Sequence, residues 1–134
     1  MTPVRFLKYH LPFWFWAVLI FITSSIPGDK LPDKTFELSD KVIHFFVYLI
    51  LYVTASYSFY KQNKFGLIKK HFYSAGLILA LLYGISDEFH QYFVPKRSCD
   101  LLDLFADAAG AAAGMLVVYF TFYKRKIICS IKND

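Results

Sequence analysis

Five acidic side chains lie within one short segment of this sequence, SDEFHQYFVPKRSCDLLDLFAD at residues 86–107. They make up half of the 10 acidic residues in the chain: Asp87, Glu88, Asp100, Asp103 and Asp107. The same segment also carries the polar residues His90, Gln91, Lys96 and Arg97. Carboxylates and histidines act as general acids and bases, and they bind divalent cations. Any chemistry that this chain performs is therefore expected to involve this segment.

The composition indicates that lipid surrounds the chain. Its 134 residues are 57% hydrophobic and 20% aromatic, and only 19% are charged. A soluble domain of ordinary composition carries about 25% charged residues. The length suits one domain, so residues 1–134 are expected to form a single unit. The acidic segment thus lies in a chain with the composition of a membrane protein.

Four apolar segments are long enough to cross a bilayer as helices, at about residues 11–26, 42–60, 72–93 and 101–123. A crossing helix needs roughly 20 mostly apolar residues, and a β-barrel would need an alternating pattern that these segments lack. The first segment ends without the small-residue motif of a cleaved signal peptide, so we expect it to remain as a helix. The predicted fold class is all-α: a polytopic membrane protein with a compact bundle of four transmembrane helices.

The basic residues predict how this bundle is oriented. Ten of the 15 fall on one side of it: Arg5, Lys8, Lys61, Lys64, Lys69, Lys70, Lys124, Arg125, Lys126 and Lys132. Cytoplasmic loops carry an excess of Lys and Arg, so both termini are expected in the cytoplasm and the acidic segment is expected to face outward. The net charge of +5 reflects this bias. Because no basic stripe is interleaved with base-stacking side chains, nucleic acid is not an expected partner.

Helical periodicity brings polar residues of three segments together. Asp103 and Asp107 share one face of the 101–123 segment, while Asp40 and His44 are four residues apart at the start of the 42–60 segment. Given the rise of an α-helix, Asp87 and Asp107 both lie roughly 8–10 Å inside the same end of the bundle. We therefore expect a polar pocket at that end.

Some of these residues also have structural explanations. Gly110 and Gly114 continue the Asp107 face with the spacing of small residues that lets helices pack closely. Asp100 suits a helix N-cap, Arg97 can extend its charge toward the membrane surface, and His44 can be a hydrogen-bonded histidine of the bundle. A carboxylate near the bilayer centre costs about 2.5–3.5 kcal/mol, so the buried acids call for a functional explanation: Asp87, Glu88, Asp103 and Asp107.

A divalent cation is one way to compensate these negative charges. The basic groups of Lys41, His44, His90 and Arg97 are another. Oxygen and nitrogen ligands suit Zn²⁺, Mn²⁺ or Mg²⁺. No spacing in the chain matches a metal signature such as H-E-x-x-H, so the sequence by itself specifies neither a metal nor another cofactor.

Four motifs, in order, resemble the VanZ-like family of membrane proteins over about residues 11–120. They are Ser24-Ser25-x-Pro27, Asp40-Lys41-x-x-His44-x-x-x-Tyr48, Asp87-Glu88-x-x-Gln91-x-x-x-Pro95-x-Arg97 and Asp103-x-x-x-Asp107-x-x-Gly110-x-x-x-Gly114. His90 lies outside the family pattern. The resemblance and the residue chemistry together define a candidate pocket: Asp40, Lys41, His44, Asp87, Glu88, Gln91, Arg97, Asp103 and Asp107.

The resemblance implies a small multi-helix protein of the bacterial plasma membrane. The family takes its name from a protein linked to resistance to the glycopeptide teicoplanin, which acts outside the membrane on the cell envelope. The first interpretation is a protein that engages membrane lipids, a lipid-linked cell-wall precursor or a lipophilic glycopeptide. The second is an intramembrane hydrolase or transferase that acts on such a precursor. The third is a transporter or assembly subunit with the acids as a proton relay, which would require an oligomer.

Overall fold

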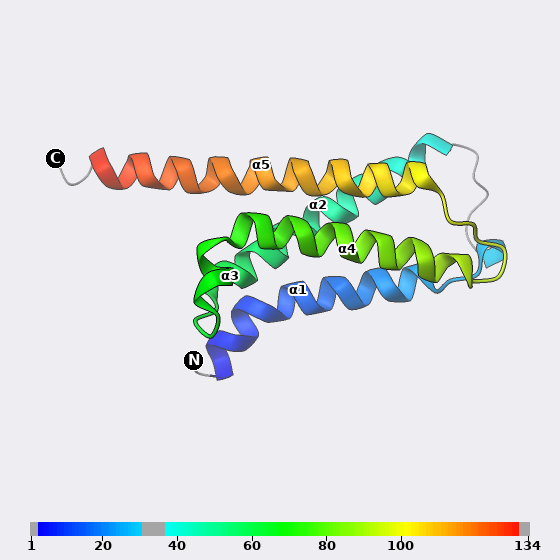
Figure 1. Cartoon of the computed structure of the whole chain (residues 1–134), viewed down its shortest axis with the longest axis horizontal. Helices are drawn as coiled ribbons and strands as arrows, with labels where there is room; N and C mark the ends of the chain where they lie inside the picture. The colour runs from blue at the N-terminus through cyan, green and yellow to red at the C-terminus, as the bar shows by residue number, and fades with distance from the viewer. Residues whose placement is uncertain (1–2, 31–36, 132–134) are drawn as a thin grey trace.

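The protein is a bundle of long helices, shown here by a computed structural model that describes residues 3–30 and 37–131 (Figure 1). The elements are α1 (Pro3–Ser24), the 3₁₀ helix η1 (Gly28–Lys30), α2 (Glu37–Lys61), α3 (Gly66–Lys70), α4 (Phe72–Tyr92) and α5 (Leu101–Ile131). No strand occurs among the described residues. The predicted all-α membrane bundle is confirmed.

Helices α1, α2 and α5 extend beyond the apolar segments from which they were predicted, whereas α4 ends one residue before its predicted end and α1 ends two residues before its own. Helix α1 begins at Pro3, α2 begins at Glu37 and α5 continues to Ile131, while the short α3 lies in a connection that was expected to be a loop. The physical reason is that hydropathy marks only the part of a helix that lies in hydrocarbon, whereas the helix itself continues into polar residues at its ends.

Within the described residues, three helical spans are long and apolar enough to cross a membrane, namely Phe6–Ser24, Asp40–Lys61 and Leu101–Phe122. Helix α4 does not join this group, since its last turns carry two carboxylates, a histidine and a glutamine. It packs against α2 and α5 all the same, and its polar face is buried inside the bundle.

Helix α2 is the centre of the bundle, because it packs against α1, α4 and α5. Its side chains Tyr48, Leu51 and Tyr52 are almost completely buried. Helix α5 approaches α2 most closely at the two glycines predicted to pack: a Cβ at Gly110 would lie 2.0 Å from the Phe45 carbonyl oxygen, and one at Gly114 would lie 2.9 Å from the Leu49 carbonyl oxygen. Gly110 and Gly114 therefore permit a backbone contact that any larger residue would prevent.

The bundle has two chemically different ends (Figure 1). The acidic end comprises η1, the first turns of α2 and α5, the last turns of α4 and the loop at 93–100. The basic end comprises the first turns of α1, the end of α2 and the segment 61–71 that includes α3. The last turns of α5 point the same way as the basic end, while Lys132 of the charge argument lies outside the described residues.

The loops of the acidic end are held against each other. The Gly28 amide donates to the Pro95 carbonyl at 3.0 Å, and a Cβ at Gly28 would lie 2.0 Å from the Lys96 carbonyl oxygen. Lys96 itself has a positive φ of 58°. This contact fixes the segment that leads from α4 to α5, and with it the position of Arg97.

Candidate functional site

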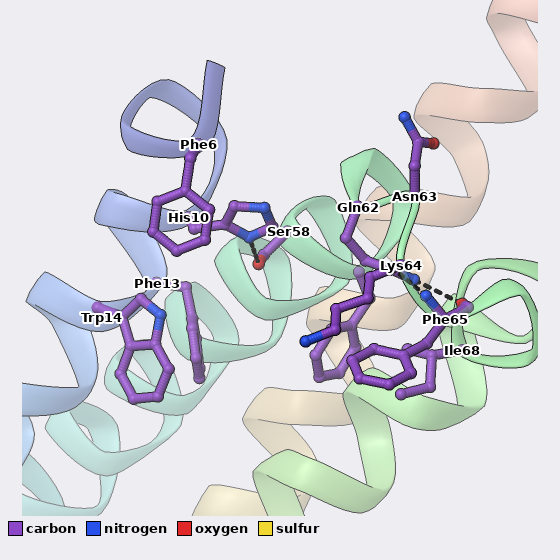
Figure 2. Close-up of a pocket in the computed structure, with 11 residues that line it drawn as sticks. Phe6, His10, Phe13, Trp14, Ser58, Gln62, Asn63, Lys64, Phe65 and Ile68 are labelled. Atoms are coloured by element: carbon purple, nitrogen blue, oxygen red, sulfur yellow. Dashed lines mark hydrogen bonds between the residues drawn. The ribbon is translucent and has the colours of Figure 1, made fainter. Parts of the chain in front are cut away.

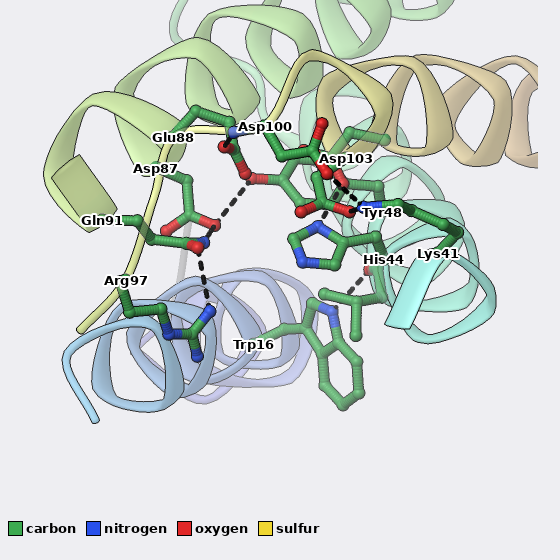
Figure 3. A network of polar contacts seen from close by, with 12 residues as sticks. Trp16, Lys41, His44, Tyr48, Asp87, Glu88, Gln91, Arg97, Asp100 and Asp103 are labelled. Carbon is green, nitrogen blue, oxygen red and sulfur yellow. Dashed lines mark hydrogen bonds and ion pairs between the residues drawn. The ribbon is translucent and has the colours of Figure 1, made fainter. Parts of the chain in front are cut away.

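The acidic cluster consists of Asp87, Glu88, Asp100, Asp103 and Asp107, and its first partner is Lys41 of α2 (Figure 3). The Lys41 ammonium lies 2.6 Å from Asp100 Oδ2 and also bonds Asp103 Oδ1. The Asp103 side chain is only 7% exposed, against 39% for Asp100. The Lys41 ammonium thus pairs with both an exposed and a buried carboxylate at the start of α5.

Asp100 also caps the N-terminus of α5, directly before its first residue. Its Oδ1 accepts the Leu102 amide at 2.9 Å, which is the hydrogen bond of an N-cap residue. Its own backbone amide donates to Glu88 Oε2 at 2.9 Å. The N-cap explanation for Asp100 is therefore correct, and the same residue joins α5 to the end of α4.

His44 lies one turn deeper on α2 than Lys41. Its Nδ1 is 2.9 Å from Oδ1 of Asp107, whose side chain is 1% exposed. This contact agrees with the interpretation of His44 as a hydrogen-bonded histidine of the bundle. It also leaves the other ring nitrogen, Nε2, available for a second contact.

Two buried carboxylate oxygens of the cluster have no hydrogen-bond partner in the part of the chain that the structure describes: Glu88 Oε1 and Asp107 Oδ2. Glu88 is 2% exposed. Ligand atoms of His44, Glu88 and Asp103 all lie within 4.8 Å of one another. A histidine nitrogen and two carboxylate oxygens at this separation form a donor set for a divalent cation such as Zn²⁺ or Mn²⁺.

A second chain of polar contacts runs along α4 toward α1. Asp87 Oδ2 accepts from the Gln91 amide at 3.3 Å and from the Tyr48 hydroxyl at 3.5 Å. Arg97 Nη1 donates to Gln91 Oε1 at 2.8 Å, and its Nη2 donates to the Thr23 carbonyl at 3.4 Å. The Arg97 guanidinium therefore bonds neutral groups at the acidic end, instead of extending away from the bundle.

A cavity of about 220 Å³ reaches both sets of contacts, since its lining includes His44 of the first set and Asp87, Gln91 and Arg97 of the second. Asp40, His44, Asp87 and Arg97 contribute polar groups to its lining, and α1 and α2 contribute apolar walls. The Trp16 indole donates to the Val47 carbonyl at 2.9 Å, which holds α1 against α2 beside the cavity (Figure 3). The cavity thus brings the Arg97 guanidinium, the Asp40 and Asp87 carboxylates and apolar side chains together in one small volume.

The expected convergence of polar residues is present, but two pairings differ from those expected. Arg97 was a candidate partner for the carboxylates, yet within the described residues it bonds Gln91 and the α1 backbone. His90 stands apart from the cluster, with its Nε2 3.0 Å from the Ser25 hydroxyl and its ring stacked on Phe21. The side chain of Gln91 is 2% exposed and links Asp87 to Arg97.

Tyr48 is the site residue that the list of candidates missed. It is 1% exposed, lines the cavity and contacts Asp87. The signal was present in the sequence, because Asp40, His44 and Tyr48 are spaced four residues apart and share a helix face. A tyrosine in an aromatic-rich segment resembles a core residue, which hides its polar contact.

Replacement of Lys41 by methionine is predicted to destabilise the bundle. The change leaves buried Asp103 without its cation, so we expect the free energy of unfolding to fall by roughly 2 kcal/mol, between the values for buried and for exposed ion pairs. Thermal unfolding in detergent measures the effect. The matched control is Lys96→Met, which removes an exposed 3.2 Å pair with Asp29 and should leave stability within about 0.5 kcal/mol of the parent. Equal effects of the two variants would contradict the structural role of the Lys41 pair.

The comparison with known proteins rests on one match. The VanZ/LLP1 family model matches residues 4–123, a range that includes the whole acidic cluster and the cavity lining. Curated proteins and solved structures give no match to the chain. Because the matched range covers nearly the entire sequence and agrees with the motifs on α1, α2, α4 and α5, the chain belongs to the VanZ/LLP1 family.

Proposed function

We propose that the acidic end binds a divalent cation and, together with Arg97, holds the phosphate group of a lipid-linked component of the cell envelope. The observation that carries the proposal is the buried Glu88 Oε1, which has no hydrogen-bond partner among the described residues and belongs to a residue of the donor set His44, Glu88 and Asp103. A buried carboxylate oxygen without a partner costs free energy that a bound cation would recover.

The contacts of His44 support a metal ligand. The Asp107 carboxylate accepts from Nδ1, which orients the ring and presents the lone pair of Nε2. Metal-binding histidines commonly have such a carboxylate behind them. In this proposal Asp107 positions His44, while Glu88 and Asp103 supply oxygen ligands.

The cavity supports a lipid phosphate as the ligand. The planar Arg97 guanidinium suits a phosphate group, with which it can form two parallel hydrogen bonds. Ile43 lines the same cavity and is 58% exposed on the outer surface of α2. A phosphate bound between Arg97 and the cation would leave its hydrocarbon chain free to pass over Ile43, between α1 and α2, into the membrane.

The proposal includes an orientation. The excess of Lys and Arg at the basic end supports a plasma-membrane protein that crosses the bilayer with α1, α2, α4 and α5, keeps both termini in the cytoplasm and turns its acidic end outward. Lipid-linked wall precursors are exposed on that outer side. A lipophilic glycopeptide of the teicoplanin type would reach the acidic end from the same side. It is the alternative ligand suggested by the protein after which the family is named.

Thiol labelling tests this orientation. The chain has 2 cysteines, and Cys99 is exposed in the loop of the acidic end. In a Cys129→Ser background, a membrane-impermeant maleimide is expected to label Cys99 in intact cells. The control is a Lys70→Cys change in a chain that lacks both native cysteines, which should be labelled only after the cells are opened. The reverse pattern would contradict the outward acidic end.

Catalysis is the second candidate function. The observation that favours it is Asp107 Oδ2, a second buried carboxylate oxygen that has no hydrogen-bond partner among the described residues. A cation on His44, Glu88 and Asp103 would lower the pKa of a bound water, and a neighbouring carboxylate could accept its proton. The enzyme would then be an intramembrane hydrolase that cleaves a phosphate ester or anhydride of the lipid. The binding function needs the cation and Arg97 alone, whereas hydrolysis also needs this base.

Cation binding by the purified protein distinguishes a metal site from a cluster that only stabilises the fold. Titration calorimetry with Mn²⁺ and Zn²⁺ should detect one site, and Glu88→Gln and Asp103→Asn should weaken it by more than about tenfold. Glu88→Gln should leave thermal stability unchanged or raised, because the amide oxygen still accepts from Asp100 and a buried charge is removed. The control is Asp29→Asn, which removes an exposed carboxylate of the same end.

The lipid is tested with the same variants. A polyprenyl-diphosphate-linked sugar in nanodiscs should bind only when the cation is present, and Arg97→Lys should weaken this binding because the planar guanidinium is lost. Cation-dependent release of phosphate would establish the hydrolase, and binding without release would establish the binding protein. Unaltered cation affinity in the Glu88 and Asp103 variants would refute both functions.

A further inference from the structure

A second cavity lies at the basic end of the bundle, away from the acidic cluster (Figure 2). Its volume is about 600 Å³, within the range of small-molecule sites. Aromatic and aliphatic side chains from three parts of the chain form most of its walls: Phe6, Phe13, Trp14, Phe59, Phe65 and Ile68. Nothing in the function proposed for the acidic end uses this cavity.

The cavity is open at the surface of the bundle. Phe6, Trp14 and Phe65 line it and are 52%, 57% and 54% exposed, respectively. Phe6 and Trp14 lie on α1 and face Phe65 of the segment 61–71 across the cavity (Figure 2), which leaves its apolar walls accessible from outside the bundle. An apolar chain is the natural occupant of such walls, since burying it removes apolar surface from water.

Hydrogen bonds within the walls hold the cavity in shape. His10 Nδ1 lies 2.5 Å from the Ser58 hydroxyl, and both residues are buried, so α1 is tied to α2. The Gln62 amide donates to the Phe65 carbonyl at 2.7 Å and accepts from the Phe65 amide at 2.8 Å. The turn that carries the rim of the cavity is thus fixed by its own contacts.

The rim of the cavity is positively charged and has no acidic residue to neutralise it. Segments 3–28 and 57–75 contain no Asp or Glu. Lys64 lines the cavity, lies 5.4 Å from the Phe65 ring centre and forms no ion pair with any described residue. At the acidic end, in contrast, Lys41 and Lys96 both have carboxylate partners. Lys64 is therefore placed to receive an anion above an apolar cavity.

We infer that this cavity is a binding site for an anionic phospholipid of the leaflet at the basic end, with an acyl chain among the aromatic walls and the phosphate at Lys64. Charge complementarity selects this ligand: the walls exclude a fully polar anion, and the unneutralised lysine favours an anionic head group over a zwitterionic one. The inference is independent of the cation site and of the orientation proposed for the bundle.

Quenching of tryptophan fluorescence tests the inference in vesicles. The chain has 2 tryptophans, so Trp16→Phe leaves Trp14 on the cavity wall as the reporter. The vesicles contain phosphatidylcholine and phosphatidylglycerol at one fixed ratio, and either lipid carries brominated acyl chains. Brominated phosphatidylglycerol is expected to quench Trp14 more strongly than brominated phosphatidylcholine, because it occupies the cavity in preference.

Lysine variants show whether the cavity or the general surface charge selects the lipid. Lys64→Gln should reduce the preference for phosphatidylglycerol about fivefold, the effect of roughly one basic side chain at an anionic surface, and Lys64→Arg should retain it. The control is Lys70→Gln, an exposed lysine of the same segment that does not line the cavity. Equal quenching by the two lipids, or equal loss in Lys64→Gln and Lys70→Gln, would overturn the inference. A monodisperse elution profile for each variant confirms that the protein remains folded.

Discussion

The pairing of buried carboxylates on α5 with Lys41 and His44 on α2 is the interaction on which the rest of the structure depends. The side chains of Asp103 and Asp107 are 7% and 1% exposed, and each meets a basic group on α2. Charges buried this deeply are tolerated only when their partners are close and well oriented. The two helices must therefore approach closely, and the glycines one and two turns further along α5 allow their backbones to do so.

The charged pairs and the glycine contacts form one continuous seam. Along α5 the spacing Asp103, Asp107, Gly110, Gly114 stays on one helix face, and along α2 the corresponding contacts run from Lys41 and His44 to the carbonyls of Phe45 and Leu49. At the acidic end α4 adds Glu88, which accepts from the Asp100 amide, and α1 closes the cavity. The candidate site and the close helix packing thus share one face of α5, with the charged residues at its start and the glycines in its middle.

Much of this arrangement could be predicted from the sequence, because it follows from local periodicity. Hydropathy identified the helices, and the spacing of Asp103, Asp107, Gly110 and Gly114 identified the buried face of α5. What periodicity does not give is the rotation and depth of one helix relative to another, so the partner of each carboxylate could not be assigned. Lys41 takes the α5 acids, while Arg97 bonds Gln91 and Thr23 because the loop at 93–100 is held against Gly28. Helix α3 was missed because its 5 residues are too few to show a helical periodicity.

The central claim is that His44 is the nitrogen ligand of a divalent cation at the acidic end. Pulsed electron paramagnetic resonance of bound Mn²⁺ tests it most directly, because the technique detects the nuclear spin of a coordinated histidine nitrogen. We predict a nitrogen coupling in the native protein that persists in His10→Gln, which alters the buried histidine of the opposite end, and disappears in His44→Gln. Bound Mn²⁺ without a nitrogen coupling in the native protein, or a coupling that survives His44→Gln, would contradict the account.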